Sequence, residues 1–178
     1  MANLDNPHGL RAVRMMNGGK IPMDKYTVNA TTAIYQGDVV QIKATGLVRT
    51  IVTTGGAATI LGVAANYTSA SGEVWVYNDP GTVFEIQSDG TTDPSTAAAA
   101  RAHIGETAVL ILTAGNTTTK VSKQELDYSS MTTGTADPLQ IIGFHPSVDN
   151  DNTLAHARYL VLLKKNVFEN VPESYSVI

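Results

Sequence analysis

The chain has 178 residues, of which 43% are hydrophobic, so it can bury a core and fits a single domain. Its net charge of −4 and its few, scattered basic residues argue against nucleic acid as the main ligand. The absence of cysteine excludes disulfides, thiolate zinc sites and a cysteine nucleophile. No segment approaches the roughly 18 apolar residues of a membrane span. The first residues lack a signal-peptide pattern, so we expect no membrane partner and synthesis in the cytoplasm of the producing cell.

Residues 1–25 are interrupted by Pro7, Gly9, Gly18 and Pro22, a density of breakers that predicts no regular element of any length. The stretch is nevertheless too apolar for a typical disordered tail. We therefore expect an extended N-terminal arm that becomes ordered by lying on another surface, with a flexible leader as the alternative.

Residues 26–165 are expected to form one β-rich body. Asn78–Gly81 is a strong turn signal, and it predicts a hairpin between the strands on either side. Gly37 and Asp38 predict a bulge or tight corner. Short strands separated by such turns favour a small β-barrel, a β-tulip-like fold or a sandwich. The expected strands lie within 33–43, 47–53, 60–65, 73–77, 82–87, 107–113, 138–144 and 158–163.

One segment has a helical pattern. Asp93 is a capping residue, Pro94 suits the first helical position and Gly105 lies just past the end. We predict a helix over 94–104, with His103 in its last turn, where a positive charge would complement the helix dipole. The spacing of Ser122–Glu125 resembles a capping box, but it predicts one helical turn at most because no apolar period follows.

The last residues, 166–178, contain several apolar side chains around Pro172. They predict a C-terminal arm or the last edge of the fold.

Motifs of common enzyme classes are missing. The sequence has no Gly-x-Ser-x-Gly elbow, no phosphate-binding loop and no dinucleotide-binding turn. The loop from Asp149 to Thr153 begins like an EF-hand, but Leu154 and Leu160 occupy the positions that need glycine and an acidic residue. We interpret it as a solvated turn. The pattern gives no reason to expect an enzyme, a cofactor or a metal.

The four histidines lack the spacing of metal ligands. His145 and His156 flank one loop and could approach each other beside Asp149, an arrangement that would favour a small hydrolase or isomerase. Structural or exposed histidines are the simpler interpretation. Trp75 and Tyr77 share one strand face, which suits either a sugar-stacking platform or core and interface anchors.

Three stretches carry a resemblance to a known family. The first contains Pro7, Gly9, Leu10, Arg11, Val13, Arg14, Asn17 and Gly18; the second is Ile34–Val40; the third is Pro138–Phe144, followed by Asp149, Asn150 and the apolar Tyr159–Leu163. In their order and spacing they resemble the capsid decoration (cement) proteins of tailed bacteriophages. The resemblance covers both ends and the early middle, about half of the chain.

The resemblance implies a structural protein on the outer surface of the virion head. Such proteins have a small β-barrel or β-tulip body, are often grouped as trimers at threefold positions, and extend terminal arms over neighbouring capsid subunits. The expected partners are therefore the major capsid protein and further copies of the chain itself, with a trimer favoured over a dimer. The family has no catalytic residues to transfer.

We expect the two arms to make the capsid contacts, because both place apolar residues on irregular backbone. The candidate contact residues are Leu4, Leu10, Arg11, Val13, Arg14, Met16, Ile21, Val167, Phe168, Tyr175 and Ile178. The main alternative is a tail, neck or fibre-associated β module that binds a host glycan. A scaffolding protein should be more helical and more charged.

Overall fold

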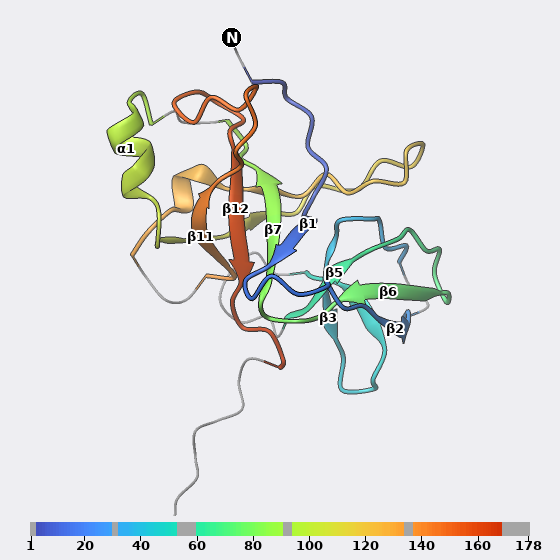
Figure 1. The fold of residues 1–178 in the computed structure, drawn as a ribbon. Helices are drawn as coiled ribbons and strands as arrows, with labels where there is room; N and C mark the ends of the chain where they lie inside the picture. The colour runs from blue at the N-terminus through green and yellow to red at the C-terminus, as the bar shows by residue number, and fades with distance from the viewer. Residues whose placement is uncertain (1–2, 30–31, 53–59, 91–93, 134–136, 169–178) are drawn as a thin grey trace, which may run out of the picture.

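The computed structural model describes residues 3–29, 32–52, 60–90, 94–133 and 137–168. Over these residues the protein is mainly β, with three antiparallel sheets and one short α-helix, so the predicted fold class is confirmed (Figure 1). None of the described helices has the length and apolar character that a membrane crossing needs.

Most strands belong to two five-stranded sheets. Sheet A has the strand order β1-β7-β12-β11-β8, with bounds Arg11–Met15, Thr82–Gln87, Arg158–Leu163, Leu139–Phe144 and Thr107–Ala108. Sheet B has the order β2-β6-β5-β3-β4, with bounds Asp24–Thr27, Glu73–Tyr77, Ile60–Ala64, Val39–Ile42 and Val48–Thr50. The third sheet pairs β9 (Leu110–Ile111) with β10 (Glu125–Leu126).

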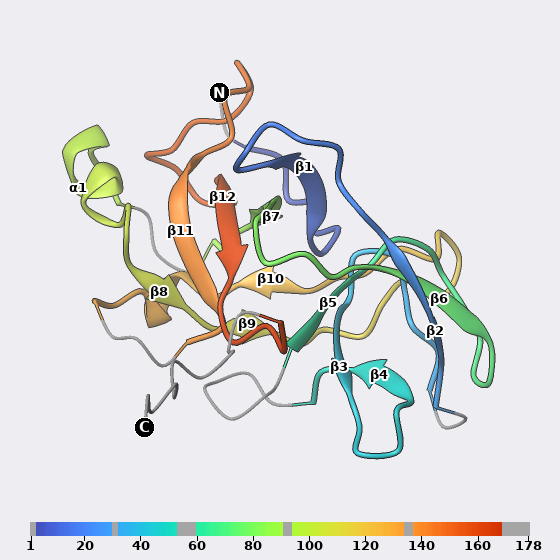
Figure 2. The same ribbon diagram turned by 60° about the horizontal axis from the view of Figure 1, so that its bottom comes forward.

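The body is sandwich-like, and the described strands form no closed barrel. The nearest approach to closure is in sheet B, where the residue that follows β2, Val28, bridges to Val48 on the opposite edge strand. Figure 2 shows the strands of sheet B grouped beside those of sheet A. Of the alternatives for the body, the sandwich therefore fits best.

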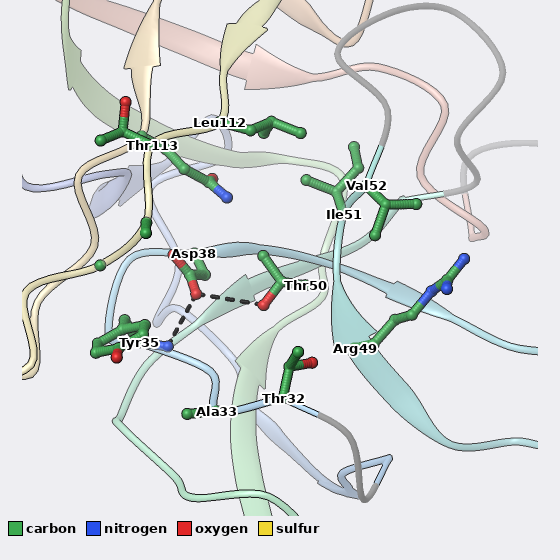
Figure 3. Close-up of a pocket in the computed structure, with 13 residues that line it drawn as sticks. Thr32, Ala33, Tyr35, Asp38, Arg49, Thr50, Ile51, Val52, Leu112 and Thr113 are labelled. Carbon is green, nitrogen blue, oxygen red and sulfur yellow. Dashed lines mark hydrogen bonds between the residues drawn. The ribbon is translucent and has the colours of Figure 1, made fainter.

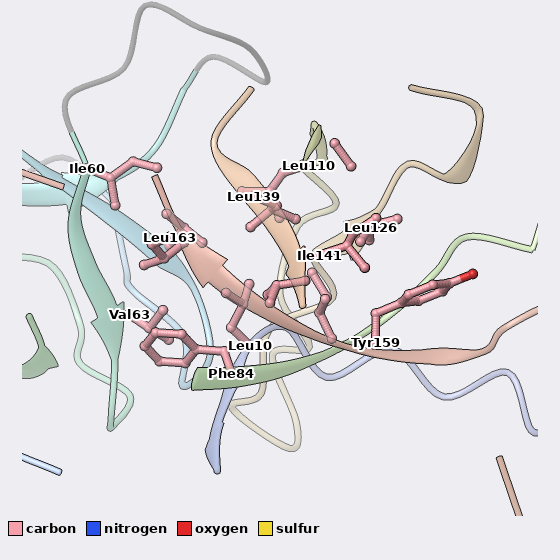
Figure 4. Close-up of a cluster of buried hydrophobic side chains, with 14 of the residues drawn as sticks. Leu10, Ile60, Val63, Phe84, Leu110, Leu126, Leu139, Ile141, Tyr159 and Leu163 are labelled. Carbon is pink, nitrogen blue, oxygen red and sulfur yellow. The ribbon is translucent and has the colours of Figure 1, made fainter. Parts of the chain in front are cut away.

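The larger apolar core lies between the two sheets. Phe84 and Tyr159 of sheet A pack in one cluster with Ile60 and Val63 of sheet B (Figure 4). A second cluster fills the other side of sheet B and includes Leu61. Consecutive residues of β5 therefore enter different clusters, which explains why every residue of this strand is buried.

The N-terminal stretch is more regular than its breakers predicted. Residues 11–15 form β1, which pairs with β7, and residues 24–27 form β2, which pairs with β6. The prediction that residues 1–25 contain no regular element is wrong. The glycines and prolines lie before and between the two strands, and the strands obtain their hydrogen bonds from distant parts of the chain.

The predicted hairpin around Asn78–Gly81 is also wrong. The turn itself exists, since the Thr82 amide donates to the Asp79 carbonyl at 3.0 Å. However, β6 belongs to sheet B and β7 to sheet A, so the turn carries the chain from one sheet to the other. The other expected pair is present, because β11 and β12 are antiparallel neighbours.

The helix α1 spans Ala97–Ala102 and is shorter than the predicted 94–104. Its N-cap is Thr96, whose hydroxyl oxygen accepts a hydrogen bond from the Ala99 amide at 3.1 Å; the predicted cap, Asp93, lies outside the described residues. The segment after Ser122 enters β10 and forms no helical turn there. A 3-10 helix, η1 (Tyr128–Ser130), follows instead, capped by Asp127.

Candidate interaction surface

Exposed apolar side chains are concentrated in the two terminal segments. Among the described residues, nine large hydrophobic side chains are exposed, and five of them lie within 3–23 or 166–168. Leu4 is 78% exposed and Phe168 is 53% exposed. The five terminal residues are Leu4, Val13, Met16, Met23 and Phe168. Such a concentration in two short segments indicates a surface that a partner covers.

The two terminal segments meet at the turn between β6 and β7. The Met16 amide donates to the Gly81 carbonyl at 2.9 Å. Pro22 and Phe168 line a shallow pocket of about 300 Å³ together with the residues of this turn. Pro22 belongs to the β1–β2 connection and Phe168 to the segment after β12. We call Met16, Pro22 and Phe168 the terminal apolar surface.

Buried neighbours hold Phe168 in its exposed position. The side-chain amide of Asn166 donates to the carbonyls of Leu61 at 3.2 Å and Asn78 at 3.1 Å. Its oxygen accepts the Phe168 amide at 2.8 Å. The Val167 amide donates to the Ile60 carbonyl at 2.8 Å, and its side chain packs against the core of sheet B. Phe168 therefore projects from an anchored segment.

β1 forms an edge of sheet A and carries part of the candidate surface. It pairs with β7, and the register shifts between Ala12 and Arg14, so Val13 lies at a bulge. A bulge on an edge strand shortens the stretch that could pair with another strand.

The candidate contact residues differ in their accessibility. Leu4, Arg11, Val13, Arg14, Met16 and Phe168 are exposed, and Ile21 and Val167 are half-buried. Tyr175 and Ile178 lie outside the described residues.

Leu10 is an exception that corrects the sequence interpretation. Its side chain is 2% exposed and belongs to the core between the sheets, so it is not accessible to a partner. Gly9 has a φ of +68° and turns the chain so that the Leu10 amide donates to the Gly37 carbonyl at 2.9 Å.

A charged cluster lies where the N-terminal segment covers sheet A. Glu85 on β7 is buried, with His8 Nε2 at 3.3 Å, His145 Nε2 at 3.3 Å and Arg158 Nη1 at 3.8 Å from its carboxylate oxygens. Arg158 also pairs with Asp149 at 2.6 Å. The hydrogen bond from His8 lowers the pKa of Glu85; burial opposes this shift, and the charges of His145, His8 and Arg158 add to it. Sequence reasoning missed Glu85, because it lies within an apolar strand pattern.

Hydrogen bonds fix the rest of this segment. The Asn3 side-chain amide donates to the Asp151 carbonyl at 2.8 Å, and its oxygen accepts the Asp151 amide at 2.8 Å. The Asn6 amide donates to Gln87 Oε1 at 3.1 Å. The EF-hand-like loop therefore has a structural role here, as a dock for the N-terminal segment.

The sequence allowed a hydrolase-like or isomerase-like cluster of His145, His156 and Asp149, and the structure places the two histidines against different residues. His145 contacts Glu85, whereas His156 lies 3.3 Å from the Gln87 side chain, two residues further along β7. His145, His156 and Asp149 do not form a compact ligand group. The corresponding hypothesis of a His145–His156–Asp149 cluster is wrong.

The nearest to a metal-ligand set within the described residues is Asp5, Glu125 and His156, whose potential ligand atoms lie within 4.8 Å of one another. Burial and the charges of Asp5 and Asp89 raise the pKa of Glu125, and His156 opposes this shift. Asp5 is exposed, and the Gln87 amide already bonds both Asp5 and His156. The group could take a divalent cation, but no buried, unpaired side chain points to one.

A groove of about 500 Å³ lies between the β3–β4 region and residues 112–115 (Figure 3). Its buried carboxylate, Asp38, accepts hydrogen bonds from the Tyr35 amide at 2.9 Å and the Thr50 hydroxyl at 3.4 Å. Burial raises the pKa of Asp38, and hydrogen bonds from Ser122, Tyr35 and Thr50 oppose the shift. All the hydrogen-bond partners of this carboxylate are residues of neighbouring loops and strands of the protein itself. We therefore interpret Asp38 as a structural residue that stabilises the predicted Gly37–Asp38 corner.

Trp75 and Tyr77 share a strand face as expected, but they do not form a joint platform. Trp75 is 46% exposed, whereas Tyr77 is half-buried and packs edge-on against Phe84 with ring centroids 6.4 Å apart. Of these two aromatic side chains, Trp75 is the one whose ring is accessible to a stacking ligand.

Comparison with known families finds no family model that matches this chain, and comparison with curated proteins finds no match either.

Proposed function

We propose that this protein is a structural, non-enzymatic virion component that binds the outer surface of a tailed-phage head and clamps neighbouring major capsid subunits. The observation that carries the proposal is the concentration of exposed apolar side chains in two anchored terminal segments. The resemblance of the N-terminal segment, of Ile34–Val40 and of 138–163 to capsid decoration proteins supports the major capsid protein as the partner. The proposed role needs no cofactor or metal.

Clamping follows from the placement of the contacts. A shell under outward pressure from packaged DNA fails where its subunits separate. A protein bound to two subunits must release one of them first, so its binding free energy adds to the barrier. Leu4 precedes β1 and Met16 follows it, so one molecule offers contacts on both sides of a rigid strand. Contacts linked in this way act as a multivalent unit.

The edge of β1 offers a second type of contact. A neighbouring capsid segment could extend sheet A by pairing with this strand, and the bulge at Val13 would limit the added pairing to a short stretch. Self-association belongs to the same proposal, with a trimer favoured over a dimer because such decoration proteins often group at threefold positions.

Point variants test the proposal better than truncation. Deletion of residues 2–22 would also remove β1 and the buried side chains of Leu10 and Met15, so lost binding could reflect lost folding. A triple variant, Leu4→Ser, Met16→Ser and Phe168→Ser, changes exposed side chains only. Val148→Ser, on an exposed loop residue, is the matched control.

The measurement is co-sedimentation with purified heads assembled without this protein, followed by the temperature at which the heads release DNA. Wild type and Val148→Ser should bind and raise that temperature. The triple variant should bind at least about tenfold more weakly. Failure of the wild type to bind heads would refute the function, and equal binding of all variants would refute a contact through Leu4, Met16 and Phe168.

A glycan-binding tail, neck or fibre module is the second candidate, favoured by the exposed Trp75. In that case Trp75→Ala should abolish glycan binding measured on a carbohydrate array, and the triple variant should retain it. Retained head binding by Trp75→Ala together with no glycan signal for the wild type would exclude this candidate.

A further inference from the structure

His8 is a buried histidine whose two ring nitrogens both face hydrogen-bond acceptors. Its side chain is 6% exposed. Nδ1 lies 2.9 Å from the carbonyl oxygen of Gly9, and Nε2 lies 3.3 Å from Glu85 Oε1. Neither Nε2 nor that carboxylate oxygen makes a well-aligned hydrogen bond with any described residue, so the ion pair between them is their polar contact.

This arrangement determines the protonation of the ring. A carbonyl oxygen only accepts hydrogen bonds, so Nδ1 must carry a proton. An ionised carboxylate also only accepts, so a proton on Nε2 makes the 3.3 Å ion-pair contact with Glu85 attractive. Glu85 is ionised near neutral pH, because its pKa lies below the ordinary value. A neutral imidazole has a single N–H group and cannot satisfy both contacts.

The other three histidines do not need the charge. His103 places Nδ1 2.7 Å from Glu106 and Nε2 2.8 Å from the Tyr128 hydroxyl, which can donate to an unprotonated nitrogen. His156 Nδ1 can accept from the Gln87 amide. His145 faces Glu85 through Nε2 alone, and no described residue bonds its Nδ1. These contacts of the three rings can each be made with a single N–H group.

Several charged groups surround His8. Glu85 on β7 is the direct partner, and Arg158 on β12 and His145 after β11 contact the same carboxylate. Asp149 reaches the cluster through Arg158. The clefts beside His8 are also lined by Arg11, His156, Asp5, Lys123 and Glu125. The one carboxylate in ion-pair contact with His8 in the described structure is that of Glu85.

We propose that His8 and Glu85 form a proton-dependent latch that holds residues 3–9 on sheet A. Loss of the Nε2 proton at alkaline pH turns a buried charge-assisted contact into a nitrogen lone pair facing a carboxylate, so docking weakens as the pH rises. Protonation of Glu85 weakens it at the acid end. Because Leu4 lies on this segment, the latch would also regulate the capsid contact, a consequence that rests on the proposed function.

NMR of the imidazole nitrogens tests the latch directly. At about pH 7.5, where unperturbed histidines are mostly neutral, His8 should still show two protonated nitrogens. In Glu85→Gln the carboxamide can donate to an unprotonated Nε2, so His8 should become a single neutral tautomer. Glu106→Gln, beside His103, is the matched control and should leave His8 unchanged. An unprotonated Nε2 of His8 in the wild type would overturn the inference.

Hydrogen exchange tests the consequence for the segment. After correction for intrinsic rates, protection of the Asn6 amide should fall about tenfold between about pH 6 and pH 8.5 in the wild type and stay constant in Glu85→Gln. The Ala65 amide, bonded to Trp75 in sheet B at 2.8 Å, is the internal reference. An equal loss of protection in both proteins would overturn the latch.

Neither measurement uses phage heads, so the two proposals can fail separately. A latch that passes both tests with no head binding refutes the function alone. Head binding whose affinity does not change between these pH values refutes the regulatory consequence alone.

Discussion

Sheets A and B have the same number of strands but differ in what covers their faces. Sheet B is apolar on both faces along β5, and the ion pair that it carries in the described part of the chain, Lys25 with Glu73, is exposed. The core between the sheets covers one face of sheet A. On its other face, Glu85 and Gln87 are buried beneath the N-terminal segment and the β11–β12 loop. Packing holds sheet B together, whereas the outer layer of sheet A depends on ion pairs and hydrogen bonds.

Because of this difference, we expect the stability of the two sheets to respond to different changes. Apolar packing responds to side-chain volume and hardly to pH. A layer held by a buried carboxylate and histidines responds to protonation and to small backbone changes. Of the two segments that we propose to contact the capsid, the N-terminal one with Leu4 is part of the second kind of layer, whereas the segment with Phe168 is anchored on sheet B.

The largest expected effects come from the shared cores, where the two sheets should behave alike. Phe84→Ala should lower the free energy of unfolding by about 3–5 kcal/mol and Leu61→Ala by about 2–5 kcal/mol, because both side chains are fully buried. Chemical denaturation at pH 6 and at pH 8 should give the same losses. Val148→Ala, at an exposed position, is the control; losses below about 1 kcal/mol in either core variant would contradict the packing described here.

The next effect concerns the N-terminal segment. A Cβ at Gly9 would lie 2.4 Å from the Gly37 carbonyl oxygen and 2.6 Å from Ser122 Cβ, at a φ of +68°. Gly9→Ala should therefore cost about 3 kcal/mol or more. Gly18 has a similar φ of +75° with open space around it, so Gly18→Ala should cost only about 1–2 kcal/mol. Thermal unfolding measures both, and equal losses would show that the segment is not docked as described.

The smallest expected effect is a difference between the two sheets in how the free energy of unfolding depends on pH. The lowered pKa of Glu85 means that its contribution is present above the ordinary value of 4.5 and is lost as the pH falls through the lower folded value. Glu85→Gln should cost about 1–3 kcal/mol at neutral pH and flatten the acid limb of the stability curve. Glu73→Gln, in the exposed pair of sheet B, should cost less than about 1 kcal/mol. Identical acid limbs for wild type and Glu85→Gln would contradict this assignment.

The sequence by itself determined the local features of this protein. The apolar run in Arg158–Leu163 predicted a strand, and Asn78–Gly81 predicted a turn, because strand preference and turn geometry depend on neighbouring residues. The exposed apolar residues Leu4, Met16 and Phe168 were also among the predicted contacts.

Only the tertiary structure decided which segments pair and which side chains are buried. The β6–β7 turn could have closed a hairpin, but it connects two sheets, since strand partners are chosen by packing between distant segments. Leu10 belonged by pattern to an arm, yet the turn at Gly9 places it in the core. The charged cluster is made of residues far apart in sequence: Glu85, His8, His145 and Arg158. No local sequence pattern predicts that three basic side chains contact one buried carboxylate. The physical reason is that burial and charge pairing are properties of contacts, which a local pattern does not specify.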